Sequence, residues 1–509
     1  MEWRHLSNIA TIVFIIVLAC VPAEPADAGT SFGITILHMN DTHGHYSPEK
    51  ARGSDILVGG FARAATLIES IVAENRAKGR ETLVLHAGDI LTGTPLSVIF
   101  KGEESVALMN RMGFQAMAIG NHEFDNGYGH LSQKLRPAAS FPFLSANITN
   151  ESGAPVFDTK LVKEYPDAGL RLVVFGLTTP NAPTSTYPRN VTGLTFKEPA
   201  VAAEHTLRGY GERDLVVALT HLGVKEDLEL AKACPIIDVI VGGHSHTALE
   251  EPAKVGKTII AQAGAYSQHL GRLDLEVKDG LVVSHRGVLM RLVPDIPEHP
   301  QVAAKIKEYE EKAGPHLRDV IGRTDVYLEG GHQAVRSGRN CDLGRLVTFA
   351  MLKRARADAA IINGGSIRAG LNKGNITLGD MYTVFPFPNS LATVELTGEE
   401  LTSVMRRSEE LPLGSGGKLQ TYGLELQDEN GHVAVNKVGA KSFNPKDKYS
   451  IAVSDFLLAG GDGYEILKSK QSAANQSYYL IGDLVVELIK ERSNITSEFV
   501  EYLRNERRP

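Results

Sequence analysis

Cysteine is scarce in this sequence of 509 residues, with only Cys20, Cys234 and Cys341 at widely separated positions. So few thiols exclude a disulfide framework and a cysteine-based zinc site. Excess positive charge is also missing, because the net charge is −7. A nucleic-acid polymer is therefore not an expected partner, and any anion must be bound locally. Hydrophobic residues at 43% and charged residues at 22% are typical of a soluble protein with a buried core.

Long apolar runs are confined to the N-terminus, where Ile9–Cys20 follows Arg4 and precedes Ala26-Asp27-Ala28. This order is typical of a secretory signal peptide, so we expect residues 1–28 to be removed and the product to be secreted or periplasmic. An uncleaved anchor is the alternative, although the run is short for a membrane span. Val17–Cys20 also resembles a lipoprotein box, which leaves an N-terminal lipid anchor open. We expect no transmembrane span in the mature chain.

Short apolar runs rich in β-branched residues recur from residue 34 onward. Helical patterns such as Phe61–Glu74 and Glu103–Met112 separate several of them. The runs are Ile34–Leu37, Thr82–Leu85, Ala116–Ile119, Leu215–Leu219 and Asp238–Val241. This alternation predicts an α/β core whose strands are buried on both faces.

Three prolines between Pro294 and Pro300 interrupt this pattern, and a charged helical stretch, Gln301–Lys312, follows. We expect a first domain over residues 29–298, a linker helix over 299–320 and a second α/β domain over 321–509. A peripheral helix of the first domain is the alternative to a linker. The strands expected in the second domain are Ala359–Ile362, Ala392–Leu396 and Tyr449–Val453.

Each apolar run of the first domain ends in residues that can bind a metal. These candidate ligands are Asp41, His43, Asp89, Asn121, His221, His244 and His246. A single Asp-x-His is often a turn, but groups at the carboxyl ends of strands in an α/β sheet meet at one edge. Oxygen and nitrogen donors of this kind suit zinc, manganese or iron. Seven donors are too many for one catalytic ion and suit two divalent ions that share a carboxylate.

The second domain contains residue types that recognise a nucleotide. Arginine offers a two-pronged donor for phosphate, aromatic rings can stack on a base, and an aspartate in a glycine turn can accept from ribose hydroxyls. The candidates are Arg336, Arg339, Asn363, Arg368, Phe387, Phe456 and Asp462. Either phenylalanine could instead be an ordinary core residue. No glycine-rich loop of the P-loop type follows a strand.

Five motifs together resemble the signature of calcineurin-like metallophosphoesterases. They are Asp41-x-His43, Gly88-Asp89, Gly120-Asn121-His122-Glu123, Thr220-His221 and Gly243-His244-x-His246. More narrowly, residues 31–505 are similar to secreted 5′-nucleotidases and UDP-sugar hydrolases. The resemblance implies an N-terminal four-layer α/β sandwich, a C-terminal α/β substrate-binding domain and two divalent metal ions.

The resemblance also implies a role for each site residue. One ion would take Asp41, His43, Asp89 and His246, and the other Asp89, Asn121, His221 and His244. His122 would be the catalytic histidine and Asp125 the carboxylate that orients it. The residues Asn363, Arg368, Phe387, Phe456 and Asp462 match nucleotide-binding positions of the family.

The function that this resemblance implies is removal of the 5′-phosphate of nucleotides outside the cytoplasm, by a hydroxide that bridges the two ions. Di- and triphosphates and UDP-sugars are further candidate substrates. One alternative is a 2′,3′-cyclic-nucleotide phosphodiesterase/3′-nucleotidase, or a hydrolase of another ester such as a thiosulfate. Another is a secreted nucleotide-binding protein without catalysis. The filled ligand positions and the His122–Asp125 pair favour an enzyme, and the aromatic pair with Asp462 favours a nucleoside substrate.

Overall fold

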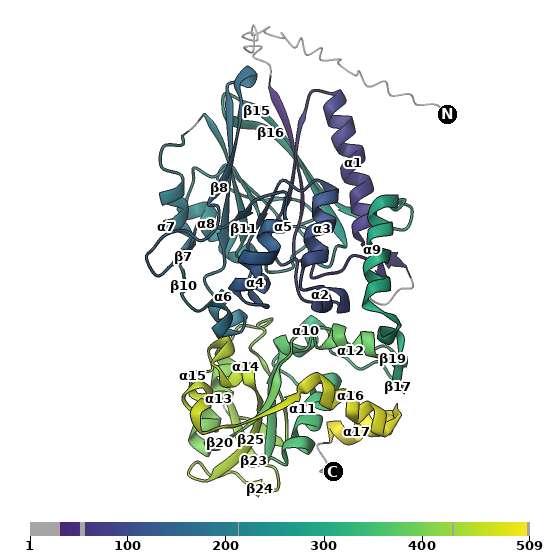
Figure 1. Ribbon diagram of the computed structural model, residues 1–509. Helices are drawn as coiled ribbons and strands as arrows, with labels where there is room; N and C mark the ends of the chain where they lie inside the picture. The colour runs from purple at the N-terminus through teal and green to yellow at the C-terminus, as the bar shows by residue number, and fades with distance from the viewer. Residues whose placement is uncertain (1–30, 51–55, 212, 430–431, 506–509) are drawn as a thin grey trace, which may run out of the picture.

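The computed structural model describes residues 31–50, 56–211, 213–429 and 432–505, so the predicted signal peptide lies outside the described residues. The chain folds into two α/β domains that meet end to end (Figure 1). Among the described residues, no helix has both the length and the apolar character needed to span a membrane.

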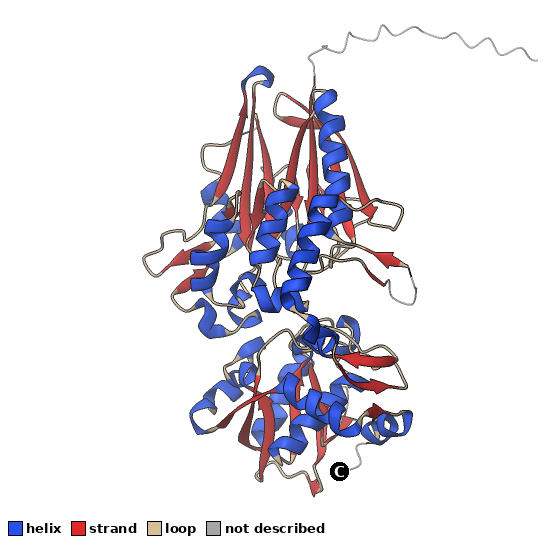
Figure 2. Cartoon of the chain, turned by 45° about the vertical axis from the view of Figure 1, so that its right-hand side comes forward, coloured by secondary structure: helices blue, strands red, loops and turns tan. Residues whose placement is uncertain are grey.

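Two six-stranded mixed sheets form the centre of the N-terminal domain (Figure 2). The first has the order β16-β15-β1-β4-β5-β6, with β1 (Phe32–Met39), β4 (Glu81–His86), β5 (Ala116–Ala118), β6 (Phe143–Leu144), β15 (His269–Lys278) and β16 (Leu281–Arg291). The second has the order β13-β14-β12-β11-β9-β8, with β8 (Lys160–Tyr165), β9 (Leu170–Thr178), β11 (Asp214–His221), β12 (Val239–Val241), β13 (Ala253–Val255) and β14 (Thr258–Ala261). Strands β1, β4, β5 and β6 run parallel, as do β9, β11, β12 and β14.

Helices cover the outer face of each sheet. The helices α1 (Phe61–Ala77), α3 (Glu103–Met112) and α9 (Pro300–Ala313) pack on the first sheet, and α7 (Pro199–Thr206) and α8 (Val224–Ala233) on the second. In β4, Leu83 and Leu85 face the other sheet, whereas Val84 faces the helices. Since side chains alternate along a strand, apolar residues on both faces bury the strand between two layers. The predicted four-layer sandwich is confirmed.

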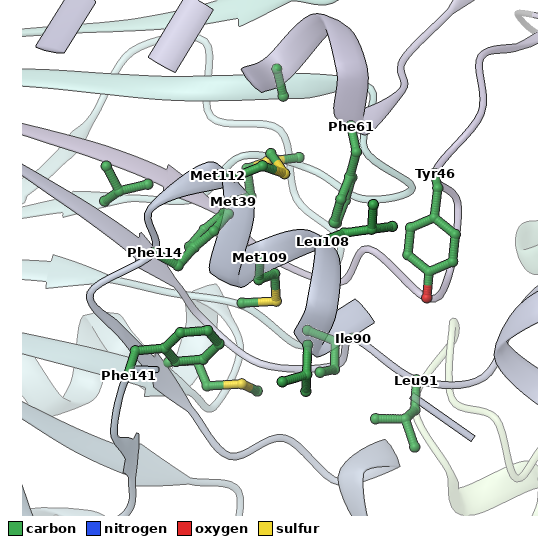
Figure 3. Close-up of a cluster of buried hydrophobic side chains, with 14 of the residues drawn as sticks. Met39, Tyr46, Phe61, Ile90, Leu91, Leu108, Met109, Met112, Phe114 and Phe141 are labelled. Atoms are coloured by element: carbon green, nitrogen blue, oxygen red, sulfur yellow. The ribbon is translucent and has the colours of Figure 1, made fainter. Parts of the chain in front are cut away.

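The outer core of the first sheet is shown in Figure 3, where Phe61 of α1 and Leu108 and Met109 of α3 pack together. Helix α3 has Glu103 and Glu104 in its first turn and ends at Gly113, whose φ is 76°. Acidic residues in the first turn stabilise a helix through their interaction with the helix dipole. A glycine in the left-handed conformation ends the helix without strain.

Helix α9 lies between the two domains in the chain order. Its residues Val302 and Ile306 are buried in the core of the first domain, beside α1 and α3. This helix therefore belongs to the packing of the first domain as well as leading to the second.

The C-terminal domain is built on a five-stranded sheet of order β21-β18-β25-β20-β26. Its strands are β18 (Ala359–Asn363), β20 (Ser390–Thr397), β21 (Leu419–Tyr422), β25 (Lys448–Ser454) and β26 (Asn475–Leu480). One face packs on α11 (Asp342–Ala355), α16 (Ile481–Arg492) and α17 (Ser497–Arg504), and the other on α13 (Gly398–Glu410), α14 (Asp455–Leu458) and α15 (Glu465–Ser469). Two smaller sheets have three strands each. One contains β17 (Val320–Thr324), β19 (Gly374–Thr377) and β27 (Asn494–Ile495). The other contains β22 (Leu424–Glu429), β23 (His432–Val438) and β24 (Lys441–Ser442).

Candidate metal centre and substrate cavity

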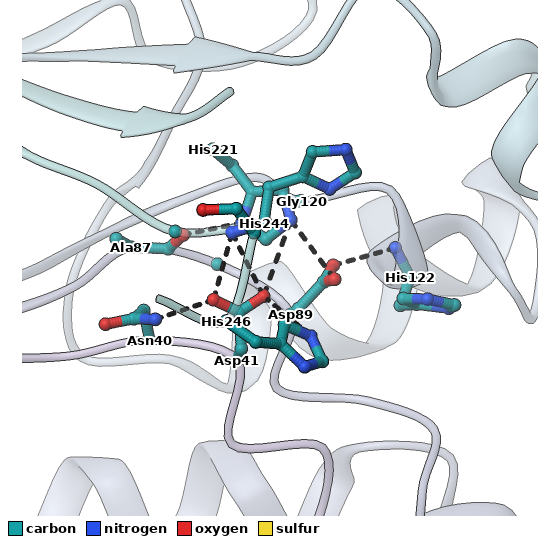
Figure 4. Close-up of polar contacts among 12 residues, drawn as sticks. Asn40, Asp41, Ala87, Asp89, Gly120, His122, His221, His244 and His246 are labelled. Carbon is teal, nitrogen blue, oxygen red and sulfur yellow. Dashed lines mark hydrogen bonds and ion pairs between the residues drawn. The ribbon is translucent and has the colours of Figure 1, made fainter. Parts of the chain in front are cut away.

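The seven predicted metal-binding residues lie where strands of both sheets end, and Figure 4 shows five of them, Asp41, Asp89, His221, His244 and His246, gathered in one place. Asp41 and His43 follow β1, Asp89 follows β4, Asn121 follows β5, His221 ends β11, and His244 and His246 follow β12. The loops are joined by their backbones, because Asp41 N donates to Gly88 O at 2.9 Å and His43 N to Asp89 O at 3.1 Å. The parallel strands thus bring residues distant in the sequence to one edge.

Asp89 lies at the centre of this cluster. His221 Nε2 is 3.1 Å from Asp89 Oδ2, and His43 Nε2 is 3.8 Å from the same oxygen. His246 Nε2 lies 3.1 Å from His43 Nε2 and 3.5 Å from Asp41 Oδ1.

Three groups of these side chains could hold a metal ion, with their ligand atoms within 4.8 Å of one another. They are Asp41–His43–His246, His43–Asp89–His122 and Asp89–His221–His244. The first and third groups correspond to the two ligand sets that the family resemblance implies.

Backbone carbonyls fix which nitrogen of two histidines faces the centre. His43 Nδ1 donates to Leu91 O at 2.9 Å, and His221 Nδ1 donates to Ala87 O at 2.7 Å. Since a carbonyl oxygen can only accept, Nδ1 carries a hydrogen in each ring, and Nε2 is the nitrogen that faces Asp89. This orientation would allow Nε2 of either ring to bind a metal ion.

The loops of the centre use backbone conformations that most residues avoid. Five of the seven predicted ligands, Asp41, His43, Asp89, His244 and His246, have φ between 48° and 77°. Such conformations are uncommon for residues other than glycine and cluster at functional sites.

Glycines beside the ligands allow the loops to approach closely. A Cβ atom on Gly88 would lie 2.7 Å from His221 Nδ1, and one on Gly243 would lie 2.5 Å from Ala87 O. These close approaches explain why glycine precedes the ligand in the Gly-Asp and Gly-His pairs of the sequence motifs.

The electrostatics of the cluster suit divalent cations. Burial and the nearby Asp89 carboxylate together raise the pKa of Asp41 to about 7, against the opposing effect of His221. Burial lowers the pKa of His244 to about 3, so this imidazole is neutral, the form that binds metals. The buried Asn121 Oδ1 has no hydrogen-bond partner among the described residues. A pair of cations would compensate the two carboxylates and use this free oxygen, so the residues present fit the predicted metals.

His122 and Asp125 lie beside the cluster. His122 Nδ1 is 2.7 Å from Asp125 Oδ2, and His122 N donates to Asp89 Oδ1 at 2.9 Å. Burial alone would lower the pKa of His122, but the carboxylates of Asp125 and Asp89 raise it above its ordinary value. The imidazole is therefore suited to carry a proton.

A cavity of about 1100 Å³ lies between the domains and is lined by residues of both. The first domain contributes Asp89, Asn121, His122, Asp125, His244 and His246. The second contributes Arg336, Asn363, Arg368, Phe387, Phe456 and Asp462. Arg339, the remaining predicted nucleotide-binding residue, is exposed and does not line the cavity.

Two arginines give the cavity positive charge near the metal centre. Burial, followed by the neighbouring Arg368, lowers the pKa of Arg336 to about 9. Within the part of the chain that the structure describes, neither guanidinium forms an ion pair, and Arg336 Nε is buried without a hydrogen-bond partner. Asn363 Nδ2 donates to Asp462 Oδ2 at 2.8 Å on the same cavity wall. The arrangement leaves two cations available to an anionic ligand.

The family assignment rests on two matches and a set of relatives. Residues 34–248 match the calcineurin-like phosphoesterase family, and residues 320–469 match the 5′-nucleotidase C-terminal domain. The chain is 30% identical to a protein named 5′-nucleotidase from Vibrio vulnificus, over 94% of each chain. This chain belongs to the 5′-nucleotidase family of calcineurin-like phosphoesterases. It is accordingly a hydrolase of phosphoric esters, and the predicted family and enzyme class are confirmed.

Two further comparisons agree with this assignment. The chain is 32% identical to the trifunctional nucleotide phosphoesterase protein YfkN of Bacillus subtilis, and spans 35% of that longer protein. The crystal structure of a 5′-nucleotidase precursor from Thermus thermophilus superposes with a TM-score of 0.81 at 28% identity, covering 91% of this chain and 97% of the other. The two-domain architecture is thus shared with a family member.

Several residues that line the cavity were not predicted from the sequence of this chain. His332, in the short helix α10 (His332–Val335), lies against His246, with ring centroids 5.3 Å apart and the rings tilted by 34°. Thr92 and Thr186 both donate to Asp125. Arg407 lines the cavity and donates to Asp462 O at 3.2 Å. None of these residues lies in a recognisable motif, so only the folded chain identifies them.

Proposed function

We propose that this protein hydrolyses the 5′-phosphate of nucleotides, giving nucleoside and inorganic phosphate, with the help of two divalent metal ions. One observation carries the proposal. The cavity between the domains has the metal-binding cluster and His122 on one wall and the candidate phosphate, ribose and base contacts on the other. A nucleotide is a ligand that can touch both walls at once.

The cluster would hold one ion with Asp41, His43, Asp89 and His246, and a second with Asp89, Asn121, His221 and His244. When bound, such ions supply Lewis-acid stabilisation of the phosphoryl oxygens and lower the pKa of water. Zinc and manganese both suit this donor set.

On this proposal, His122 supplies a proton to the leaving group. Its Nδ1 is held by Asp125 Oδ2 at 2.7 Å, which leaves Nε2 to interact with substrate. As the phosphorus–oxygen bond breaks, Nε2–H would donate its proton to the nucleoside oxygen, and the imidazole becomes neutral. No serine or cysteine nucleophile is required.

The opposite wall would hold the rest of the nucleotide. Arg336 and Arg368 are free to bind phosphate oxygens, for which the guanidinium fork is well suited. Asp462 Oδ1 is available to a ribose hydroxyl, since Oδ2 already accepts from Asn363. Phe387 and Phe456 line the same cavity and offer aromatic faces to the base.

The first test measures phosphate release from 5′-AMP by the purified protein. We expect activity that a chelator abolishes and that zinc or manganese restores. Release from 2′,3′-cyclic AMP or 3′-AMP without release from 5′-AMP would favour the phosphodiesterase alternative. Tight nucleotide binding without hydrolysis would show a binding protein and contradict the proposal.

The second test asks whether the C-terminal wall recognises a nucleoside. Asp462→Ala should raise KM for AMP strongly while sparing p-nitrophenyl phosphate, which has no ribose. Equal effects on the two substrates would remove the nucleoside assignment.

We further propose that the enzyme acts outside the cytoplasm, supported by the signal-peptide pattern before residue 28. Sequencing the N-terminus of the protein isolated from cells would test this, and a lipid-modified Cys20 would establish the anchored alternative. Product analysis with ATP and a UDP-sugar would show whether longer phosphates are also substrates.

A further inference from the structure

Two threonines from separate loops hold the carboxylate that orients His122. Thr92 Oγ1 donates to Asp125 Oδ2 at 2.6 Å, and Thr186 Oγ1 donates to Asp125 Oδ1 at 2.9 Å. We propose that Thr92 and Thr186 are positioning residues for proton donation by His122, an inference that rests on the proposed function.

The three hydrogen bonds leave the Asp125 carboxylate little freedom to rotate. Oδ2 accepts from both His122 Nδ1 and Thr92, while Oδ1 is held by Thr186. Asn190 Nδ2 also donates to the backbone oxygen of Asp125 at 2.9 Å. Because the plane of the carboxylate determines the direction of the Nδ1–H bond, it also determines where Nε2 points. Both hydroxyls therefore act on His122 through Asp125.

The backbone of Thr92 supports a specific role for its side chain. Its φ is +66°, a conformation that is a genuine outlier for a β-branched residue. Thr92 N donates to Ser97 Oγ at 2.6 Å, which helps to maintain this conformation. Glycine or asparagine would adopt the same backbone more easily. A glycine at this position would have no side-chain donor for Asp125, so the hydroxyl bond is the feature of Thr92 that glycine would not reproduce.

Thr186 connects this arrangement with the second domain. It follows the helix α6 (Ala182–Ser185), which contacts the short turn Gly461–Gly463 of the second domain at the boundary between the domains (Figure 1). The next residue, Tyr187, packs against the core of the C-terminal domain, and Thr186 itself is 2% exposed. Contact between the domains therefore fixes the loop that holds one oxygen of Asp125.

The chemistry predicts which reactions need this arrangement. A nucleoside oxygen is a poor leaving group and must receive a proton as its bond to phosphorus breaks. The His122 Nε2–H bond supplies that proton, while Nδ1–H stays bonded to Asp125. A p-nitrophenolate ion leaves without a proton, so misplacement of His122 should affect it far less.

The experiment compares Thr186→Val and Thr186→Ser, and likewise Thr92→Val and Thr92→Ser, in the full-length metal-loaded protein. Valine keeps the shape and removes the hydroxyl, whereas serine keeps the hydroxyl. We expect each valine variant to lower kcat for AMP by about tenfold or more, which is a part of the roughly 10²–10⁴-fold that general acid catalysis contributes. KM for AMP, kcat for p-nitrophenyl phosphate and metal content should stay within about twofold, and serine should restore most of the activity.

Thr192→Val is the matched control, because Thr192 lies in a neighbouring turn, is exposed, and donates only to Arg189 O at 3.0 Å. If Thr92→Val fails to fold, the two Thr186 variants decide the question. An equal loss of activity with both substrates, or no loss with AMP, would overturn the inference. A wild-type protein that hydrolyses neither substrate with metal bound would instead refute the proposed function, and this inference with it.

Discussion

The rings of His122 and Phe387 lie 27° from parallel with centroids 5.8 Å apart, although each belongs to a different domain. Arg368 lies over the same phenylalanine, with its guanidinium carbon 5.8 Å from the ring centroid. Phe387 therefore covers the histidine of the metal centre and faces the substrate cavity. This contact links the residue expected to donate a proton with one expected to contact the base.

Replacing Phe387 should weaken nucleotide binding. We expect Phe387→Ala to raise KM for AMP about tenfold or more, since stacking of a base on an aromatic ring contributes about 1–3 kcal/mol. Phe387→Tyr keeps the aromatic face and should behave nearly as wild type. Steady-state kinetics with AMP would check this, and an unchanged KM for the alanine variant would argue that the ring only covers His122.

Arg336 and Arg339 provide a matched pair for the phosphate contact. Arg336 lines the cavity and Arg339 is exposed outside it. A hydrogen bond to a charged group contributes about 1.5–3 kcal/mol, so Arg336→Met should raise KM for AMP at least about tenfold. Arg339→Met should change it by less than about twofold. The reverse order of effects in the same assay would assign the phosphate to Arg339.

Metal removal should reduce both activity and thermal stability. A ligand at a hundred times its Kd stabilises the folded state by about 2.7 kcal/mol, so chelation should lower Tm measurably. Elemental analysis of the wild-type protein should give two ions per chain. Asp89→Asn should lose more metal than His246→Gln, because Asp89 lies in both predicted ligand sets. Full occupancy in the Asp89 variant would contradict a shared carboxylate.

Glu104 should make stability depend on pH. Its buried carboxyl accepts from Tyr46 Oη at 2.7 Å, and burial raises its pKa from 4.5 to about 7. A raised pKa favours the protonated form in the fold. The stability that it contributes is therefore fully present below about pH 4.5 and is lost as the pH rises through 7.

The measurement for Glu104 is the free energy of unfolding of wild type and Glu104→Gln between pH 5 and pH 8. Wild type should lose up to about 3 kcal/mol relative to the variant over this range. Parallel pH profiles for the two proteins would show that Glu104 does not ionise in this way.

The sequence alone predicts the helices and strands that position the predicted metal-binding residues. The predicted helix Glu103–Met112 has the bounds found in the structure, and the runs Thr82–Leu85 and Leu215–Leu219 lie within β4 and β11. Apolar residues on both faces of these strands leave few alternatives to a buried sheet. The glycine-flanked polar residues at the strand ends then follow from the topology of the sheet.

Other parts of the site could not be read from the sequence. Spacing alone did not distinguish Arg336 from Arg339, because the side of a loop that faces a cavity depends on its backbone path. Thr186 reaches Asp125 across 61 residues of chain, through a hydrogen bond that no local pattern predicts. His332 meets His246 only because the two domains pack together.

The predicted ligands come from two separate sheets. Strands β1, β4 and β5 of the first sheet lead to Asp41, His43, Asp89 and Asn121. Strands β11 and β12 of the second sheet lead to His221, His244 and His246. A bound pair of cations would thus link the two sheets of the N-terminal domain. Amide hydrogen exchange at the ends of β1 and β11 should slow together when metal is added. The ions would then stabilise the fold of the N-terminal domain as well as take part in the reaction.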